Sequence, residues 1–160
     1  MQPVLRMITF VIVLGLGLTI GLAAQATDPA AGTWKLNLTK SKYEPANRAP
    51  KSATGTIEAT DGGLKFTNDG VDSAGKTTHN EWTGKYDGKD NVVKGDPSRD
   101  TASLRKIDNY TYEVISKKAG KVVTTNETVY SRDGKSRTQT TTGTNAQGEK
   151  FKNVTVSDRQ

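Results

Sequence analysis

Along most of the chain, apolar and polar side chains alternate with a period of two in short runs that end at Gly, Asp, Asn or Pro. The first run, TWKLNL (residues 33–38), places Trp34, Leu36 and Leu38 on one face and polar residues such as Lys35 on the other. This alternation is typical of β-strands with one buried face. After residue 30, no stretch carries apolar residues at the spacing of an amphipathic helix over two turns. The pattern therefore predicts an all-β protein.

About ten such runs follow one another at the spacing of roughly 8–12 residues that is typical of sandwiches and barrels. They are residues 33–38, 52–60, 64–68, 76–86, 91–94, 101–107, 110–116, 121–131, 136–143 and 149–157. Residues 27–160 also contain 21 threonines, and this β-branched residue favours strands.

Short connections join these runs, and several contain Asp-Gly, as at Asp61-Gly62 and Asp133-Gly134. Asp-Gly favours tight hairpin turns because glycine adopts positive φ without strain. Consecutive strands should then pair as antiparallel neighbours, and a long meander tends to close because closure removes exposed edges. The prediction for residues 27–160 is a single domain, an antiparallel up-and-down β-barrel of about 8–10 short strands. Closure as a two-sheet sandwich is the alternative that the pattern leaves open.

The N-terminal segment has the three parts of a secretory signal peptide. Arg6 is its only charged residue, residues 7–24 are apolar, and Ala24-Gln25-Ala26 places small residues at alternate positions. We predict a signal peptide over residues 1–26, cut after Ala26, which gives a secreted or periplasmic protein with no stable membrane insertion. Residues 7–24 are also long enough to span a bilayer, so an uncleaved anchor is the alternative.

Charge and cysteine content narrow the possible partners. The chain has 23 Lys and Arg against 17 Asp and Glu, and its net charge is +6. The excess is spread along the chain, with neither the basic stripe nor the motif of a nucleic-acid binder, so no nucleic-acid partner is predicted. The absence of cysteine excludes a disulfide framework, a lipid-modified cysteine and thiolate metal ligands. We expect a monomer held together by its core and its backbone hydrogen bonds.

The stretch GTWKL (residues 32–36) looks like the N-terminal G-x-W signature of the calycin group, which includes the lipocalins and the fatty-acid-binding proteins. The longer run GTWKLNLTKSKYEP also resembles small secreted bacterial proteins described as lipocalin-like. The resemblance implies structural motif positions for Gly32 and Trp34, with the tryptophan plugging one end of the barrel. It also implies a small apolar or amphipathic molecule bound inside the barrel.

Two features depart from the fatty-acid-binding proteins. The segment after the first strand contains Pro45 and Pro50 and has no helical pattern, so their helical lid is expected to be absent. The last strand, within KFKNVTVSDRQ, lacks the Arg-x-Tyr arrangement that holds a fatty-acid carboxylate in that family. The resemblance therefore does not imply a fatty-acid ligand.

Aromatic residues on the apolar faces of the later strands are the candidate ligand-binding residues. They are Phe66, Trp82, Tyr86, Tyr112 and Tyr130. Their other interpretation is that they only fill the core, as most inward aromatics do. Threonine-rich faces are predicted to make one interior wall polar, with Thr124, Asn126 and Thr128 on one strand and Thr138, Thr140 and Thr142 on the next. Such a wall favours an amphipathic or polar ligand, or an interior packed with threonine and water.

His79 is the only histidine and lies two residues before Glu81, on the same face of its strand. A histidine–carboxylate pair can act in acid–base catalysis, so a hydrolase using His79 is the one enzymatic alternative. Trp82 and Tyr86 lie on the opposite face and are the residues that a core would bury, so we expect His79 to face solvent. One histidine without a cluster of acids does not make a metal site. We predict no metal, no cofactor and no catalysis.

Two functions remain open at this point. The first is an exported lipocalin-like protein that binds a small amphipathic or hydrophobic molecule inside its barrel. The alternative is an envelope or extracellular interaction module that binds polymer or protein on its surface.

Overall fold

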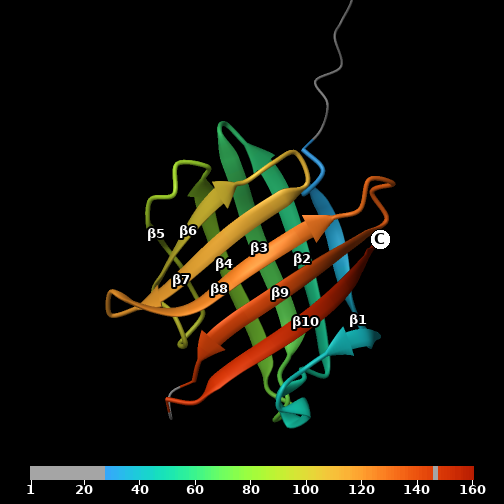
Figure 1. Cartoon of the computed structure of the whole chain (residues 1–160), viewed down its shortest axis with the longest axis vertical. Helices are drawn as coiled ribbons and strands as arrows, with labels where there is room; N and C mark the ends of the chain where they lie inside the picture. The colour runs from blue at the N-terminus through green and yellow to red at the C-terminus, as the bar shows by residue number, and fades with distance from the viewer. Residues whose placement is uncertain (1–27, 146–147) are drawn as a thin grey trace, which may run out of the picture.

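The computed structural model describes residues 28–145 and 148–160. In these residues the chain forms ten β-strands and one short 3₁₀ turn (Figure 1). The strands are β1 (Gly32–Lys42), β2 (Ser52–Thr60), β3 (Gly63–Val71), β4 (Thr77–Lys85), β5 (Asn91–Val92), β6 (Thr101–Lys106), β7 (Thr111–Lys118), β8 (Lys121–Tyr130), β9 (Ser136–Thr144) and β10 (Lys150–Arg159). The 3₁₀ turn η1 (Ala46–Arg48) follows β1. The predicted signal peptide and its cleavage after Ala26 lie outside the described residues.

The strands form one antiparallel sheet in the order β4-β3-β2-β1-β10-β9-β8-β7-β6-β5. Every hairpin pairs sequence neighbours, and β1 pairs with β10 to join the two ends of the meander. Isolated bridges between Glu81 and Lys94 and between Asp87 and Arg105 bring the two edges of the sheet together. The sheet therefore curls into a nearly closed barrel in which β1–β4 cross behind β7–β10 (Figure 1). The predicted all-β, up-and-down barrel is confirmed.

Large side chains fill the end of the barrel where residue 28 enters. The buried apolar residues are Ala30, Trp34, Ile57, Leu64, Trp82, Val93, Ala102, Leu104, Tyr112 and Tyr130. Most come from alternate positions of the strands, as the period of two requires. The turn η1 lies at the opposite end (Figure 1). There the Arg48 guanidinium stacks on the Phe151 ring, 4.5 Å from its centroid. The connection after β1 thus carries a single 3₁₀ turn.

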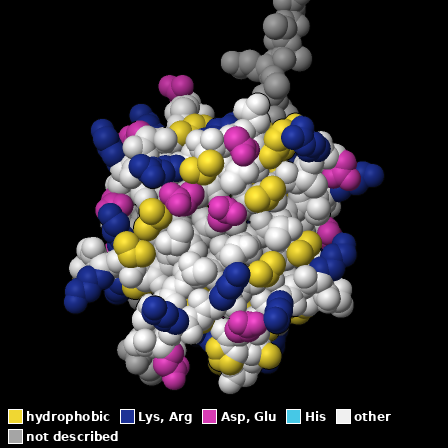
Figure 2. All heavy atoms as spheres, viewed as in Figure 1, with side chains coloured by type: hydrophobic (Ala, Val, Ile, Leu, Met, Phe, Trp, Pro, Cys, Tyr) yellow, Lys and Arg dark blue, Asp and Glu magenta, His cyan; other side chains and the backbone are white. Residues whose placement is uncertain are grey.

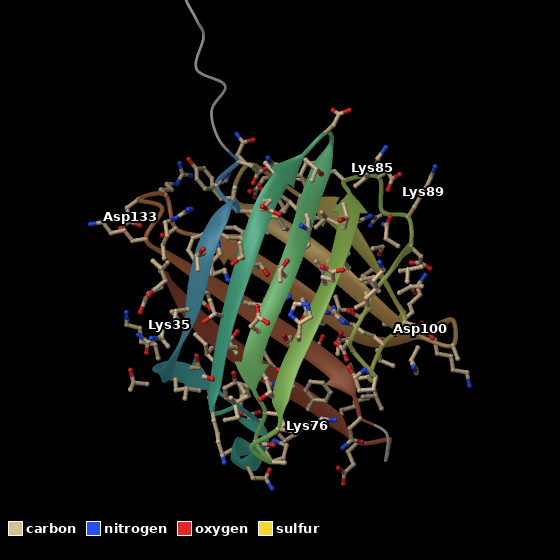
Figure 3. All side chains as sticks on the ribbon, turned by 180° about the vertical axis from the view of Figure 1, so that it is seen from behind. Lys35, Lys76, Lys85, Lys89, Asp100 and Asp133 are labelled. Atoms are coloured by element: carbon tan, nitrogen blue, oxygen red, sulfur yellow. The ribbon has the colours of Figure 1, made fainter. Side chains whose placement is uncertain are left out.

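The first strand departs from the simple alternation after Asn37. Its register against β10 shifts between Asn37 and Lys42, so the intervening residues bulge away from the ladder. The Ser41 hydroxyl stabilises the bulge by donating to the Asn37 carbonyl at 2.7 Å and accepting from the Val156 N–H at 3.0 Å. Leu38 is consequently 41% exposed, and its predicted inward position is wrong. Lys35 lies on the outer side, as predicted (Figure 3).

Candidate functional site

A cavity of about 180 Å³ lies inside the barrel, next to the packed end. Its apolar lining comes from Phe66, Trp82, Leu104, Tyr112, Val114 and Tyr130. Its polar lining comes from Asn68, Asn80, Arg99, Asn126, Arg137 and Gln139, together with the Thr128 hydroxyl. Four of the five predicted ligand-binding aromatics therefore line one cavity.

An aromatic pair on β3 and β4 forms part of the cavity wall. Phe66 and Trp82 are direct partners in the antiparallel ladder, which places their side chains on the same face. Their rings stack with centroids 4.5 Å apart and planes 6° from parallel. Tyr112 and Tyr130 meet edge to face on the other side of the barrel, with centroids 5.4 Å apart. A planar apolar group in the cavity would therefore find aromatic surface in reach.

One of the two arginines in the lining has its hydrogen bonds satisfied by the protein. Arg99 donates from Nε to Asp96 at 2.9 Å, from Nη1 to Ser116 at 3.1 Å and from Nη2 to the Asn80 amide oxygen at 3.2 Å. Both members of the Arg99–Asp96 pair are largely buried, with 16% and 20% of their side chains exposed. The Asp96 carboxylate therefore balances the positive charge of Arg99.

Arg137 on β9 has no such counter-charge. Its Nε is buried without a hydrogen-bond partner, and it forms no salt bridge with a carboxylate in residues 28–145 or 148–160. The side chain shares the inward face with Tyr130, its partner across the β8–β9 ladder, and the guanidinium lies 5.6 Å from the Trp34 ring centroid. Gly55 leaves room for it, since a Cβ there would lie 3.2 Å from Arg137 Nη2. Arg137 therefore brings an uncompensated positive charge into the barrel.

Trp34 and Gly32 both lie in the packed end of the barrel. Trp34 is fully buried, donates from Nε1 to the Ala30 carbonyl at 2.9 Å and stacks under the Arg159 guanidinium, 4.2 Å away. Gly32 has φ of 140°, and a Cβ there would collide with Arg159 Nη1. Only glycine leaves room for this arginine, which donates to the carbonyls of Ala31 at 2.6 Å and Pro29 at 2.8 Å.

Tyr86, the fifth predicted aromatic, lies outside the cavity lining. Its hydroxyl donates to Asp28 at 2.7 Å, alongside Tyr112 at 2.6 Å and the Lys106 ammonium at 3.0 Å. Burial alone would raise the pKa of Asp28. The hydrogen bonds from Tyr112, Tyr86, the Ala30 N–H and Lys106 outweigh that effect and hold the pKa below its ordinary value. Tyr86 thus anchors Asp28 against the barrel end.

The polar wall of the cavity differs from the predicted one on β9. Tyr130 is paired with Arg137 and Thr128 with Gln139, so these partners share the inward face. Thr138, Thr140 and Thr142 alternate with them and face outward, and their predicted place in the wall is wrong. Both faces of β9 are polar, so no apolar stripe indicated which one was inward. The signal that could have found Arg137 is the RDGK hairpin, whose register follows from the Ser131–Ser136 pair.

His79 is exposed on the outside of β4, as predicted. Its partner is Asp69 on the neighbouring strand, at 2.7 Å from Nδ1, rather than the Glu81 suggested by the sequence. The hydrogen bond and the charge of Asp69 raise the pKa of His79. A solvent-exposed pair outside the cavity lacks the desolvated setting of an acid–base site.

Replacing His79 with alanine is therefore expected to leave both the urea-unfolding midpoint near pH 7 and any ligand affinity at the wild-type values, because exposed ion pairs contribute little. Unfolding curves and fluorescence titrations of the two proteins measure this. A His79→Ala variant that lost binding or a hydrolytic activity would place the functional site on this outer surface instead.

No family model, curated protein or solved structure matches the chain. The described part of the chain contains no group of three or more His, Cys, Asp or Glu arranged to hold a metal ion. Within the same two ranges, no helix is long and apolar enough to cross a membrane.

Proposed function

We propose that this chain is an exported, monomeric barrel protein of the calycin type that binds a small amphipathic molecule in its interior. The single observation that carries the proposal is the cavity of about 180 Å³, which has stacked aromatic rings on one side and amide and guanidinium groups on another. A barrel interior that served only as a core would be filled with side chains.

The size of the cavity limits the size of the ligand. An enclosed apolar cavity of about 150 Å³ accepts one benzene molecule, whereas sites for drug-sized ligands measure roughly 300–1,000 Å³. A cavity of about 180 Å³ therefore accommodates about one ring with a short substituent. Long acyl chains do not fit this space, which agrees with the missing Arg-x-Tyr arrangement on the last strand.

The alternative function, binding of a polymer or protein on the surface, gains no specific support. The face formed by β7–β10 shows basic, acidic and apolar side chains interspersed over the surface (Figure 2). Val122 and Val129 are exposed at 57% and 44%, and isolated apolar residues of this kind are ordinary on a protein surface. A salt-sensitive pull-down of envelope material by the purified protein would favour this alternative.

Filling the cavity tests the proposal directly. Val114 lines the cavity from β7, and Val114→Phe places a ring in the space that the ligand would occupy. We expect at least about a tenfold loss of affinity, because the ligand must compete with a covalently attached group of the same size. The measurement is intrinsic tryptophan fluorescence, since Trp82 lies in the wall.

The matched control is Val129→Phe, which adds the same ring to the exposed outer face of the adjacent strand β8. It should bind as the wild type does. The ligands to titrate come from native mass spectrometry of the protein isolated from its own compartment. If no small molecule co-purifies, and none of a panel of one-ring amphiphiles changes the fluorescence, interior binding is wrong.

A further inference from the structure

We propose that the molecule bound in the barrel is a small aromatic carboxylate of about one ring, whose negative charge is held by Arg137 and whose ring lies against the Phe66–Trp82 pair. This inference rests on the proposed function and specifies the chemical class of its ligand. The charge of the ligand, its planarity and its length follow from three separate observations.

The charge follows from the ion pairs of the interior. Asp96 compensates Arg99, and Lys106 lies against Asp28 at 3.0 Å. Within residues 28–145 and 148–160, Arg137 has no carboxylate partner, and its buried Nε–H is unpaired. Arg159, another cation at this end of the barrel, donates to the backbone carbonyls of Gly134, Ala31 and Pro29. An unpaired charge on a partly buried side chain is unfavourable, so an anionic group entering the cavity gains from supplying the missing partner.

A carboxylate fits this position better than other small anions. The guanidinium is a planar donor that matches the two oxygens of a carboxylate. The cavity beside it also has apolar walls from Leu104 and Val114, which a fully hydrated inorganic anion would not occupy favourably. The ligand must therefore combine one anionic end with an apolar body.

The shape of that body follows from the aromatic wall. Phe66 and Trp82 are stacked face to face, within 6° of parallel, so the pair offers a ligand its ring edges and at most one outer ring face. An aromatic ring of the ligand can meet these edges and this face by edge-to-face contact or offset stacking, which stabilises the contact beyond simple burial. The volume of about 180 Å³ limits the body to about one ring. Benzoate is the simplest molecule with these properties.

The experiment titrates the full-length mature protein with benzoate, benzamide, cyclohexanecarboxylate and decanoate, using calorimetry and tryptophan fluorescence. We expect benzoate to bind at least about tenfold more tightly than the other three. Benzamide lacks the negative charge, cyclohexanecarboxylate lacks the aromatic ring, and decanoate is too long for the cavity. Arg137→Gln should lower the benzoate affinity by about 10–100-fold while changing benzamide affinity less than about threefold. Arg132→Gln is the control, since Arg132 is an exposed arginine in the hairpin just before β9.

A second variant separates ligand binding from a structural role. If Arg137 serves to receive an anion, the ligand-free Arg137→Met protein should be as stable as the wild type or more stable, because it removes an uncompensated charge. A large drop in its unfolding midpoint would show that the guanidinium holds Tyr130 and Trp34 in place, and would overturn the inference.

The outcomes also distinguish the two proposals. Equal binding of benzoate and benzamide, or unchanged benzoate affinity in Arg137→Gln, would overturn the requirement for an anionic ligand. It would leave interior binding intact, provided that Val114→Phe still weakens binding at least about tenfold. If cyclohexanecarboxylate bound more tightly than benzoate, the ligand would not need an aromatic ring. If decanoate bound more tightly, the proposed limit on ligand length would be wrong. If none of the four binds and no ligand co-purifies, both proposals are wrong.

Discussion

Replacing Trp34 with alanine is expected to lower the free energy of unfolding by about 3–5 kcal/mol, the usual cost of deleting a fully buried large aromatic side chain. The indole is the central contact of the packed end, where it meets Tyr130 edge to face at 5.1 Å and lies under Arg159 at 4.2 Å. Its loss would leave a cavity and two cations without their aromatic neighbour. Such a loss is a large part of the roughly 5–15 kcal/mol that stabilises a typical domain.

Urea unfolding followed by circular dichroism measures this effect. Leu38→Ala is the control on the same strand, because Leu38 is 41% exposed in the bulge of β1. It is expected to change the free energy of unfolding by less than about 1 kcal/mol. Trp34→Phe keeps a ring but loses the Nε1 donor to the Ala30 carbonyl, and should fall between the two. An alanine variant as stable as the control would mean that Trp34 does not hold the barrel end together.

Replacing Asp28 with asparagine is expected to lower the free energy of unfolding at pH 7 by about 3 kcal/mol, since hydrogen bonds to charged groups contribute about 1.5–3 kcal/mol each. The carboxylate of Asp28 is 13% exposed and accepts from four donors, three of them the side chains of Tyr86, Tyr112 and Lys106. An asparagine amide turns one of these acceptor positions into a donor that faces other donors.

The same substitution should change the dependence of stability on pH. The folded-state pKa of Asp28 lies below its ordinary value of about 3.9, so its contribution is complete above that pH and is lost as pH falls through the lowered pKa. The wild type should therefore lose more stability than Asp28→Asn between about pH 4 and pH 2. Asp61→Asn, in the exposed β2–β3 turn, is the control and should keep the wild-type acid dependence.

Stability at alkaline pH provides an independent test of the contacts between Asp28, Tyr86 and Tyr112, which we call the Asp28 cluster. Burial, followed by the hydrogen bond to Asp28 and its negative charge, raises the pKa of Tyr86 and of Tyr112. Their contribution to stability is complete below the ordinary tyrosine pKa of about 10 and is lost as pH rises through the folded values. In Asp28→Asn, the phenolate absorbance of these tyrosines should appear at lower pH. If phenolate absorbance appeared at the same pH in both proteins, Asp28 would not accept hydrogen bonds from these tyrosines.

The strands could be predicted from the sequence because most of them alternate between apolar and polar side chains. Phe66 and Trp82 alternate with polar side chains along strands that have one solvent-exposed face, and this alternation indicates which face is buried. Asp-Gly turns then set the hairpins, and the ten predicted runs correspond to the ten observed strands. The same reasoning failed for Leu38, since the backbone bulge that exposes it depends on hydrogen bonds of Ser41 to β1 and β10.

The candidate site could be predicted only in its aromatic half. Alternate residues of each strand face the barrel interior, so aromatic residues at these positions on separate strands meet in the cavity. They are Phe66, Trp82, Tyr112 and Tyr130. Arg99 and Arg137 were missed, because arginine is ordinarily a surface residue and the polar alternation of β9 looks the same in either register. Asp28, outside any strand, carries no periodic signal at all.

The antiparallel all-β meander and the inward position of its aromatic side chains follow from the order of residues alone, since alternation and turn chemistry are local properties of the backbone. Which of the many charged side chains enter the barrel, and which of them find a partner there, depends on how the strands come together in the closed barrel. That outcome depends on register between strands and on space left by small residues such as Gly55 beside Arg137. The cavity, with the Arg137 guanidinium in its wall, exists only once the meander has closed.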